Sequence, residues 1–332
     1  MTMFDNIEKL FQIFDSSVLI YKKDTNLTYF EGVLEIGYYF FDDTFELNVS
    51  VDAKNKIDNI LGKMNIDEYS SEETRKAFQL VFLKAMRQNV QSHHQMTADS
   101  VALFISYLVS KLTTGKQDLT LIDPAIGTGN LLTAVVNQNP NKFQNIFGIE
   151  IDDSLIKIAL INANMQKHSI ELIHQDTLEK IFVPQGDILI CDIPVGYYTR
   201  NELAKSYFMS NEEEMSYIHE LFIERSINLV NEDGYLVLLI PNILFESPNS
   251  KKLHSFISDN AYILGLVHLP ESLFKNQSQQ KSIFILQKKG SKAIKPNHTM
   301  LVELPSFNNV QAFEKVVAQI NNWFEKELKI IV

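Results

Sequence analysis

The chain has 332 residues, of which 45% are hydrophobic and 21% are charged. Every apolar run falls short of the roughly 18 consecutive residues that a membrane-spanning helix needs, so the sequence excludes an integral membrane protein with helical spans. The 41 acidic residues outnumber the 30 basic ones and give a formal net charge of −11. This balance argues against a general DNA coat protein, because that class binds phosphates through Lys and Arg. It leaves room for a local basic groove.

The N-terminus and the cysteine usage both predict a cytoplasmic location. The first residues carry acids and no basic segment ahead of an apolar stretch, so no secretory signal peptide is expected. The single cysteine, Cys191, excludes an intramolecular disulfide and a zinc cluster built on cysteines.

Residues 1–93 are expected to form a mainly helical N-terminal domain. The segments Asn6–Phe14, Ala53–Leu61 and Glu73–Asn89 space their apolar residues at three and four, which is typical of amphipathic helices. The aromatic-rich stretch Thr28–Phe40 fits a helix or a strand. No catalytic constellation is visible in this part of the chain.

Residues 94–332 alternate apolar strands with amphipathic helices, which predicts a doubly wound α/β sheet. The expected strands are Leu119–Asp123, Ile146–Ile151, Ile170–His174, Asp187–Cys191, Tyr235–Pro241, Ile263–Leu269 and Ser282–Gln287. The expected helices are Ala98–Leu112, Asn130–Asn137, Ser154–Lys167, Glu213–Val230, Glu246–Ser258 and Val310–Leu328. The last two strands lack a helical connection, so they are expected to pair as an antiparallel edge.

Glycines and acids gather where the first three strands of this sheet end. Asp123 closes the first strand and is followed by Gly127 and Gly129, which let a ligand approach the backbone closely ahead of a helix N-terminus. Glu150 ends the second strand about twenty residues later, where an acid binds ribose hydroxyls. Asp176 follows the third strand and is placed to meet an adenine amino group. Together these residues predict a site for a cofactor that contains adenosine.

Two common nucleotide signatures are incomplete or missing. Leu132 occupies the third glycine position of the dinucleotide fingerprint, which disfavours NAD. No Gly-x-x-x-x-Gly-Lys-Ser/Thr motif occurs, which disfavours hydrolysis of ATP or GTP.

The glycine turn resembles the Asp-Pro-x-x-Gly-Ser/Thr-Gly motif of class I S-adenosylmethionine-dependent methyltransferases, specifically that of adenine-N6 DNA methyltransferases. It reads Asp123-Pro-Ala-Ile-Gly-Thr-Gly. The segment that starts Gln95-Met-Thr-Ala is similar to the Gln-Tyr/Phe-Thr-Pro element of type I modification subunits. Leu269-Pro-Glu-Ser-Leu-Phe and Lys281-Ser-Ile-Phe-Ile-Leu resemble the edge-strand region of those subunits. The group that the chain resembles most is the stand-alone YtxK-type proteins, because no separate target-recognition domain is visible.

The resemblance implies a Rossmann-like seven-stranded sheet with S-adenosylmethionine as cofactor and no metal. The glycine loop would hold the methionine moiety, Glu150 the ribose, Ile151 one adenine face and Asp176 the adenine amino group, while Thr97 would lie against the methionine end. The residues implied in cofactor binding are Thr97, Asp123, Pro124, Ala125, Gly127, Thr128, Gly129, Asn130, Leu131, Glu150, Ile151, Asp176 and Thr177.

The target motif departs from the pattern of the family. Where those enzymes carry Asn/Asp-Pro-Pro-Tyr/Phe, this chain reads Asp192-Ile193-Pro194-Val195. In the family, the first side chain and a backbone carbonyl accept the hydrogens of the adenine amino group and orient its nitrogen. Asp192 keeps an acceptor, with Ile193 and Pro194 beside it, but Val195 removes a stacking ring worth about 1–3 kcal/mol per base. Tyr197 or Tyr198 could supply a ring, or both could be packing residues.

Three functions therefore remain open at the sequence level. The first is an N-methyltransferase on adenine in DNA, with DNA as partner. The second is a methyltransferase on RNA, on protein or on a small amine. The third is a cofactor-binding interaction protein without turnover.

A lysine-rich stretch and an acidic run can each be explained by a role in stabilising the fold. The lysines between Lys275 and Lys295 could follow a phosphate backbone or only protect a sheet edge. The acidic run Glu212–Glu214 is expected in the first turn of its helix. The adjacent His93 and His94 do not share a helix face, so no metal site is expected.

Overall fold

The computed structural model describes residues 2–88, 96–211 and 214–330. The predicted domain boundary between residues 93 and 94 lies outside the described residues, so the division into two domains at that point stays a prediction. His93, His94 and Gln95 also lie outside the described residues. The helices are α1 (Met3–Thr25), α2 (Tyr29–Phe41), α3 (Val51–Leu61), α4 (Ser71–Gln88), α5 (Asp99–Leu112), α6 (Asn130–Gln138), α7 (Asp153–Met165), α8 (Asn201–Ala204), α9 (Ile218–Asn228), α10 (Ser250–Asn260) and α11 (Val310–Glu327). The strands are β1 (Leu119–Asp123), β2 (Phe143–Glu150), β3 (Glu171–His174), β4 (Gly186–Asp192), β5 (Val230–Pro241), β6 (Ala261–His268), β7 (Lys281–Lys288) and β8 (Met300–Glu303).

The N-terminal region is helical, as predicted, and local capping explains two of its helix starts. Thr2 and Asp5 form a capping box at α1, and Thr28 and Glu31 form another at α2. The aromatic stretch that fitted a helix or a strand is therefore a helix. The capping box at its start stabilises this helix, because the Thr28 and Glu31 side chains accept hydrogen bonds from each other's backbone N–H groups.

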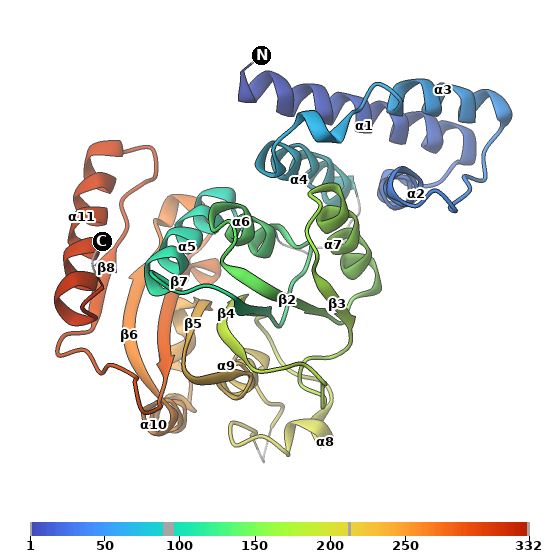
Figure 1. The fold of residues 1–332 in the computed structure, drawn as a ribbon. Coiled ribbons are helices and arrows are strands. Elements are labelled where there is room, and N and C mark those ends of the chain that lie inside the picture. The colour runs from blue at the N-terminus through green and yellow to red at the C-terminus, as the bar shows by residue number, and fades with distance from the viewer. Residues whose placement is uncertain (1, 89–95, 212–213, 331–332) are drawn as a thin grey trace.

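The core of these helices extends into the sheet region. Ile158, Ile161 and Met165 of α7 are buried in the same cluster as the apolar faces of α1, α2 and α4. Gly37 of α2 packs so closely on α7 that an added Cβ would lie 2.6 Å from Ile161. Figure 1 shows α1 to α4 together above the sheet region, and within this group α2 packs on α7 while α4 packs on α6 and α7.

The sheet has eight strands in the order β3-β2-β1-β4-β5-β7-β6-β8. Strands β1 to β5 are parallel, as predicted, and β7 is antiparallel to both β5 and β6. The expected antiparallel pair is present, but it is not an edge, because β8 adds to β6 in parallel. The sequence did not reveal β8, since four residues are too few to show an apolar period.

Two helices begin later than their periodicity suggested. α9 starts at Ile218 because the preceding residues are held extended by the bridge between Tyr197 and Tyr217. The acidic run is therefore not in the first turn of α9: Glu214 precedes the helix, and residues 212–213 lie outside the described residues. α10 starts at Ser250, since Pro248 keeps Ser247 extended and separates α10 from the short 3-10 helix Asn242–Glu246.

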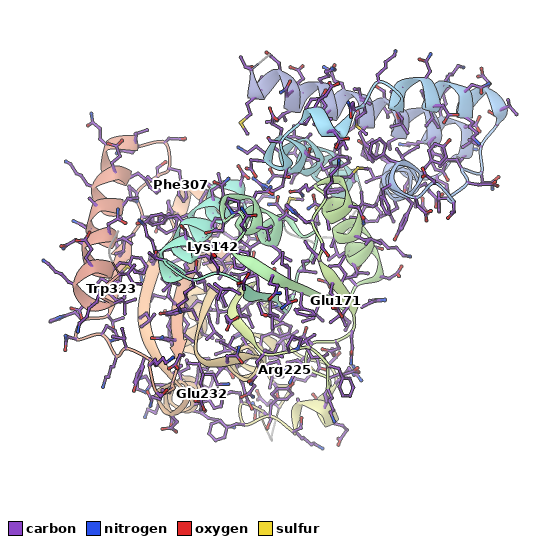
Figure 2. All side chains as sticks on the ribbon, viewed as in Figure 1. Lys142, Glu171, Arg225, Glu232, Phe307 and Trp323 are labelled. Atoms are coloured by element: carbon purple, nitrogen blue, oxygen red, sulfur yellow. The ribbon has the colours of Figure 1, made fainter. Side chains whose placement is uncertain are left out.

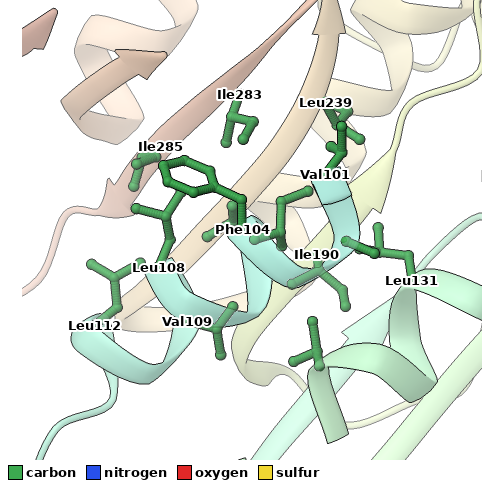
Figure 3. Packing of buried hydrophobic residues seen from close by; sticks show 14 of the residues in the cluster. Val101, Phe104, Leu108, Val109, Leu112, Leu131, Ile190, Leu239, Ile283 and Ile285 are labelled. Atoms are coloured by element: carbon green, nitrogen blue, oxygen red, sulfur yellow. The ribbon is translucent and has the colours of Figure 1, made fainter. Parts of the chain in front are cut away.

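Helices cover both faces of the sheet and bury its strands. On β4, Ile188 and Ile190 pack toward α5 and α6, while Leu189 and Cys191 pack toward α9 and α10. Figure 3 shows the first layer, with Val101, Phe104, Leu108 and other α5 residues against β4, β5 and β7. This packing leaves the carboxyl ends of the central strands open. None of the helices in the described ranges is long and apolar enough to cross a bilayer.

Candidate active site

A cavity of about 560 Å³ opens at the carboxyl ends of β1, β2 and β4. Most of the residues that the sequence singled out line it, which brings five separate chain segments together. The lining residues predicted from sequence are Thr97, Asp123, Pro124, Ala125, Gly127, Thr128, Asn130, Leu131, Glu150, Ile151, Asp176, Thr177, Asp192, Ile193, Pro194, Val195 and Tyr198. Gly129 and Tyr197 are not among the lining residues.

The glycine turn between β1 and α6 depends on backbone conformations that favour glycine. Gly127 has φ +56 and an added Cβ would meet nothing within 4 Å, so its backbone faces open space at the cavity wall. Gly129 has φ +78 and is the N-cap of α6. The loop therefore exposes backbone to a ligand at Gly127 and turns the chain into the helix at Gly129.

Asp123 is a buried acid that has no basic partner in the described part of the chain. Its Oδ1 accepts a bond from the Ala125 N–H (3.1 Å), and its side chain lies at the cavity wall. Burial raises the pKa of Asp123 to about 8, and the nearby carboxylates of Glu150 and Asp192 add to the rise. A cation bound in the cavity would reverse this shift by stabilising the ionised form.

Glu150 connects the glycine turn to the start of α7. Its Oε2 accepts from the Gly127 N–H (2.9 Å), and its Oε1 accepts from the N–H groups of Ile151 (3.0 Å) and Asp152 (2.9 Å). Burial raises the pKa of Glu150 above its usual value despite these donors. Ile151 is 60% exposed and offers an apolar surface at the cavity rim.

Asp176 lies at one end of the cavity and is held by several donors. Its Oδ2 accepts from the Tyr198 hydroxyl (2.6 Å) and from Arg200 (3.2 Å), and its Oδ1 accepts from the Leu178 N–H (3.0 Å). Burial, together with this bond to Asp176, raises the pKa of Tyr198. The Tyr198 ring is thus fixed beside Asp176.

The loop after β3 is tied to the rest of the site through Thr177. The Thr177 hydroxyl donates to the carbonyl of Pro124 in the glycine turn. Arg225 of α9, labelled in Figure 2, donates to the carbonyls of Thr177 (2.8 Å) and Glu179 (2.9 Å). These bonds hold the β3 loop against the glycine turn.

Asp192 ends β4 on the other side of the cavity, and two side chains donate to its carboxylate. The Thr97 hydroxyl donates to Oδ2 (2.9 Å), and Lys281 at the start of β7 forms an ion pair with Oδ1. Ile193 continues the strand by donating its N–H to the Leu239 carbonyl (3.1 Å). Val195 follows at the rim and is 51% exposed.

Tyr197 stacks on a neighbour outside the cavity lining. Its ring lies on Tyr217 with centroids 5.0 Å apart and planes at 25°. The ring is 53% exposed, so the pair forms an aromatic surface near the segment that follows the target motif.

A buried arginine of the helical region supports both sides of the cavity, and the sequence gave no sign of it. The Arg75 side chain is fully buried; it pairs with Glu72 and Asp99 and donates to Asn130 Oδ1 (2.7 Å). Asn130 in turn donates to the Thr97 carbonyl (3.1 Å). A hydrogen-bonded path therefore runs from Arg75 through Asn130 and Thr97 to Asp192.

The lysine-rich stretch does not form one surface. Lys281 lies at the cavity, whereas Lys288 is at the other end of β7, where its amine donates to the Val230 carbonyl. The two ends of β7 are about seven residue steps of 3.4 Å apart, and contact of these lysines with a phosphate backbone stays a prediction. Among the described residues, no group of three His, Cys, Asp or Glu side chains could hold a metal ion.

Two family models match the chain. One described as N-6 DNA Methylase matches residues 94–327, and one described as YtxK N-terminal helical domain matches residues 8–86. The Bacillus subtilis protein YtxK is 43% identical over 325 residues, which are 97% of this chain and 99% of that protein.

Solved structures agree with these matches. A Listeria monocytogenes protein, described as a candidate class I S-adenosylmethionine-dependent methyltransferase, has a TM-score of 0.90 and 35% identity over 96% of this chain and 99% of that chain. The modification subunit of a candidate type I restriction enzyme from Vibrio vulnificus has a TM-score of 0.71 at 12% identity, covering 95% of this chain and 90% of that chain, and shows the fold alone.

Proposed function

This chain belongs to the N-6 DNA methylase family, and from that premise we propose that it methylates the N6 amino group of adenine in DNA. The observation that carries the proposal is the position of Asp192. Its acceptor oxygens lie in the same cavity as the glycine turn and the acids Asp123 and Glu150, so an amine held there would face a cofactor bound at the turn.

S-adenosylmethionine is the cofactor, and the donor set of the cavity fits it. The methionine end of this molecule carries cationic groups, and Asp123 is a buried acid that none of the described basic side chains pairs with. Gly127 leaves room for close approach at the turn. Glu150 would hold the ribose hydroxyls and Ile151 would contact the adenine. The cofactor supplies a methyl group bound to a sulfonium sulfur.

The residues of the chain act on the cofactor and on the amine by binding and orientation. Asp192 and the Ile193 carbonyl accept the two hydrogens of the amino group and direct its nitrogen lone pair. A cofactor held at the glycine turn would supply the methyl group to this nitrogen, and one of the amino hydrogens that Asp192 and the Ile193 carbonyl hold would leave as a proton to water. Pro194 fixes the backbone after these acceptors.

The aromatic residues take different roles in this proposal. Tyr198 supports the cofactor end, because its hydroxyl is bonded to Asp176. Val195 lies at the rim where a target base enters, and it offers contact without a ring. Tyr197 and Tyr217 form a stacked pair outside the lining, which suits contact with a neighbouring base more than with the target itself.

The direct test is transfer of labelled methyl groups to unmethylated DNA, with RNA and cell-extract protein in parallel. We expect label in DNA as N6-methyladenine, and a loss on the order of a hundredfold for Asp192→Ala with cofactor affinity retained. Label only in RNA, protein or small amines would move the substrate to those classes. Bound cofactor without transfer to any of them would favour the non-catalytic interaction protein.

A further inference from the structure

The inference concerns the charge at the amine site. Asp192 is at the end of β4, and Lys281 pairs in register with Pro241 of β5, the strand that lies between β4 and β7. The Lys281 side chain therefore reaches across the end of β5 to meet Asp192. Of the described residues that line the cavity, Lys281 is the only basic one, whereas Asp123, Glu150, Asp176 and Asp192 are acidic.

We propose that Lys281 is a specificity-determining residue that neutralises Asp192, so that the site accepts an uncharged, conjugated amino group and discriminates against alkylammonium ions. The proposal rests on the proposed function in taking Asp192 as the acceptor for the target amine. It goes further by assigning the class of amine and the residue that selects it.

The argument starts from the ionisation of the two kinds of amine. An alkylamine such as a lysine side chain has a pKa near 10.4, so at neutral pH it is a cation without a free lone pair. A carboxylate without a partner would attract that cation and hold it in an unreactive form. Lys281 removes the attraction, because a second cation would meet a like charge beside Asp192.

The same arrangement leaves space for a neutral amino group. A carboxylate offers about four lone-pair positions. Thr97 and Lys281 each take one, on different oxygens, so Asp192 can still accept a hydrogen from an amine that carries no charge. The ion pair therefore need not open for an exocyclic amino group of a base to bind.

The test compares two small probes at neutral pH in the presence of S-adenosylhomocysteine, which carries no transferable methyl group. The probes are 2′-deoxyadenosine and n-butylammonium, and the readout is the ratio of their dissociation constants from protein-observed NMR titration. In Lys281→Met we expect butylammonium to bind about tenfold more tightly relative to 2′-deoxyadenosine than it does in the parent chain. The change is limited to this size because Lys281 and Asp192 are both partly exposed and therefore screened by solvent.

Three variants control this measurement. Lys281→Arg keeps the charge and should keep the parent ratio. Lys292→Met removes an exposed lysine that is not part of the cavity lining and should also leave the ratio unchanged. Lys281→Gln offers a second neutral side chain should Lys281→Met be poorly folded, and we expect the same shift from it.

An unchanged ratio in both neutral variants, or an equal shift in Lys292→Met, would overturn the proposal. Methyl transfer to DNA by the parent chain is measured separately. If DNA is not methylated but the ratio still shifts, the proposed function fails and the role of Lys281 stands. If DNA is methylated and the ratio does not shift, only the role of Lys281 fails.

Discussion

The two halves of the cavity hold their carboxylates in different ways. On the cofactor side, Asp123 and Glu150 accept hydrogen bonds from backbone N–H groups of the turns after β1 and β2, and no described basic side chain pairs with either acid. On the target side, Asp192 receives a hydroxyl and an ammonium group from distant segments. The cofactor side is thus ready to receive positive charge, whereas the target side is already neutralised.

This difference separates two tasks within one cavity. A cationic cofactor gains from unpaired acids, because it supplies the charge that they lack. A neutral target gains from an acceptor whose charge is compensated, because a bare carboxylate would favour the wrong kind of amine. The substitutions below act on both halves or on one half only.

Removing Arg75 should disturb both halves and have the largest effect. We expect Arg75→Met to lower the free energy of unfolding by about 3 kcal/mol, because Glu72 and Asp99 lose their buried partner. This is the low end of the range for a broken buried ion pair, since both acids are partly exposed. Cofactor affinity and methyl transfer should both fall, since Asn130 loses its support. Denaturant unfolding and calorimetry measure the two effects.

The neighbouring Lys76 is the matched control. It contacts the same two acids at 3.7 and 3.9 Å but is more exposed, so Lys76→Met should change stability by less than about 0.5 kcal/mol. Equal stability of the two variants would show that the Arg75 cluster does not support the site.

Glu150→Ala should affect the cofactor half. Glu150 already accepts three backbone N–H bonds and has about one lone-pair position left, and a charge-assisted bond from a ribose hydroxyl is worth about 1.5–3 kcal/mol. We therefore expect cofactor affinity to fall by roughly ten- to a hundredfold. Calorimetric titration measures the affinity, with Glu171→Ala on the exposed end of β3 as the control. Glu150→Gln keeps acceptance from the Gly127 N–H and should lie between parent and alanine variant. Unchanged affinity in Glu150→Ala would contradict the ribose assignment.

Val195→Phe should affect the target half. The added ring would stack on the target base and gain about 1–3 kcal/mol, which raises the efficiency of transfer by roughly ten- to a hundredfold. Cofactor affinity should stay the same. Tyr197→Leu should lower transfer by only about fivefold, the low end of the stacking range, because its ring is outside the cavity lining and would contact a neighbouring base alone. A large loss in Tyr197→Leu would instead make that tyrosine the stacking residue.

The pH dependence of cofactor affinity should report the ionisation of Asp123 and give the smallest effect. Burial raises the pKa of Asp123 to about 8, so below that pH the free chain holds a proton that a cationic ligand must displace. Affinity should rise with pH up to about 8, by at most about tenfold per unit, and then level off.

The ligand amino group also titrates, so Asp123→Asn is the reference. The ratio of the parent and variant affinities isolates the carboxyl group. A ratio that is constant between about pH 6.5 and about pH 8.5 would mean that Asp123 does not meet the cation of the cofactor.

The secondary structure was predictable where one local signal dominates. β1 matches its predicted range from Leu119 to Asp123, because a continuous apolar run ends in an acid and a glycine turn. The start of α9 was not predictable, since the Tyr197–Tyr217 bridge keeps the preceding residues extended. The strand β8 was missed because its four residues show no periodic apolar pattern, and only the pairing with β6 makes them a strand.

The sequence by itself determined the cofactor half of this protein, from Asp123 to Thr177, together with its fold and its family resemblance. Those features lie in short strand–turn–helix units, where backbone conformation and neighbouring residues set the geometry. The sequence also showed the target motif at Asp192, but only the tertiary structure decided which distant side chains contact it. Lys281 meets Asp192 across 89 residues, and Arg75 meets Asn130 across 55. Such pairs depend on how the sheet orders its strands and where the helical region packs, and no local pattern records either.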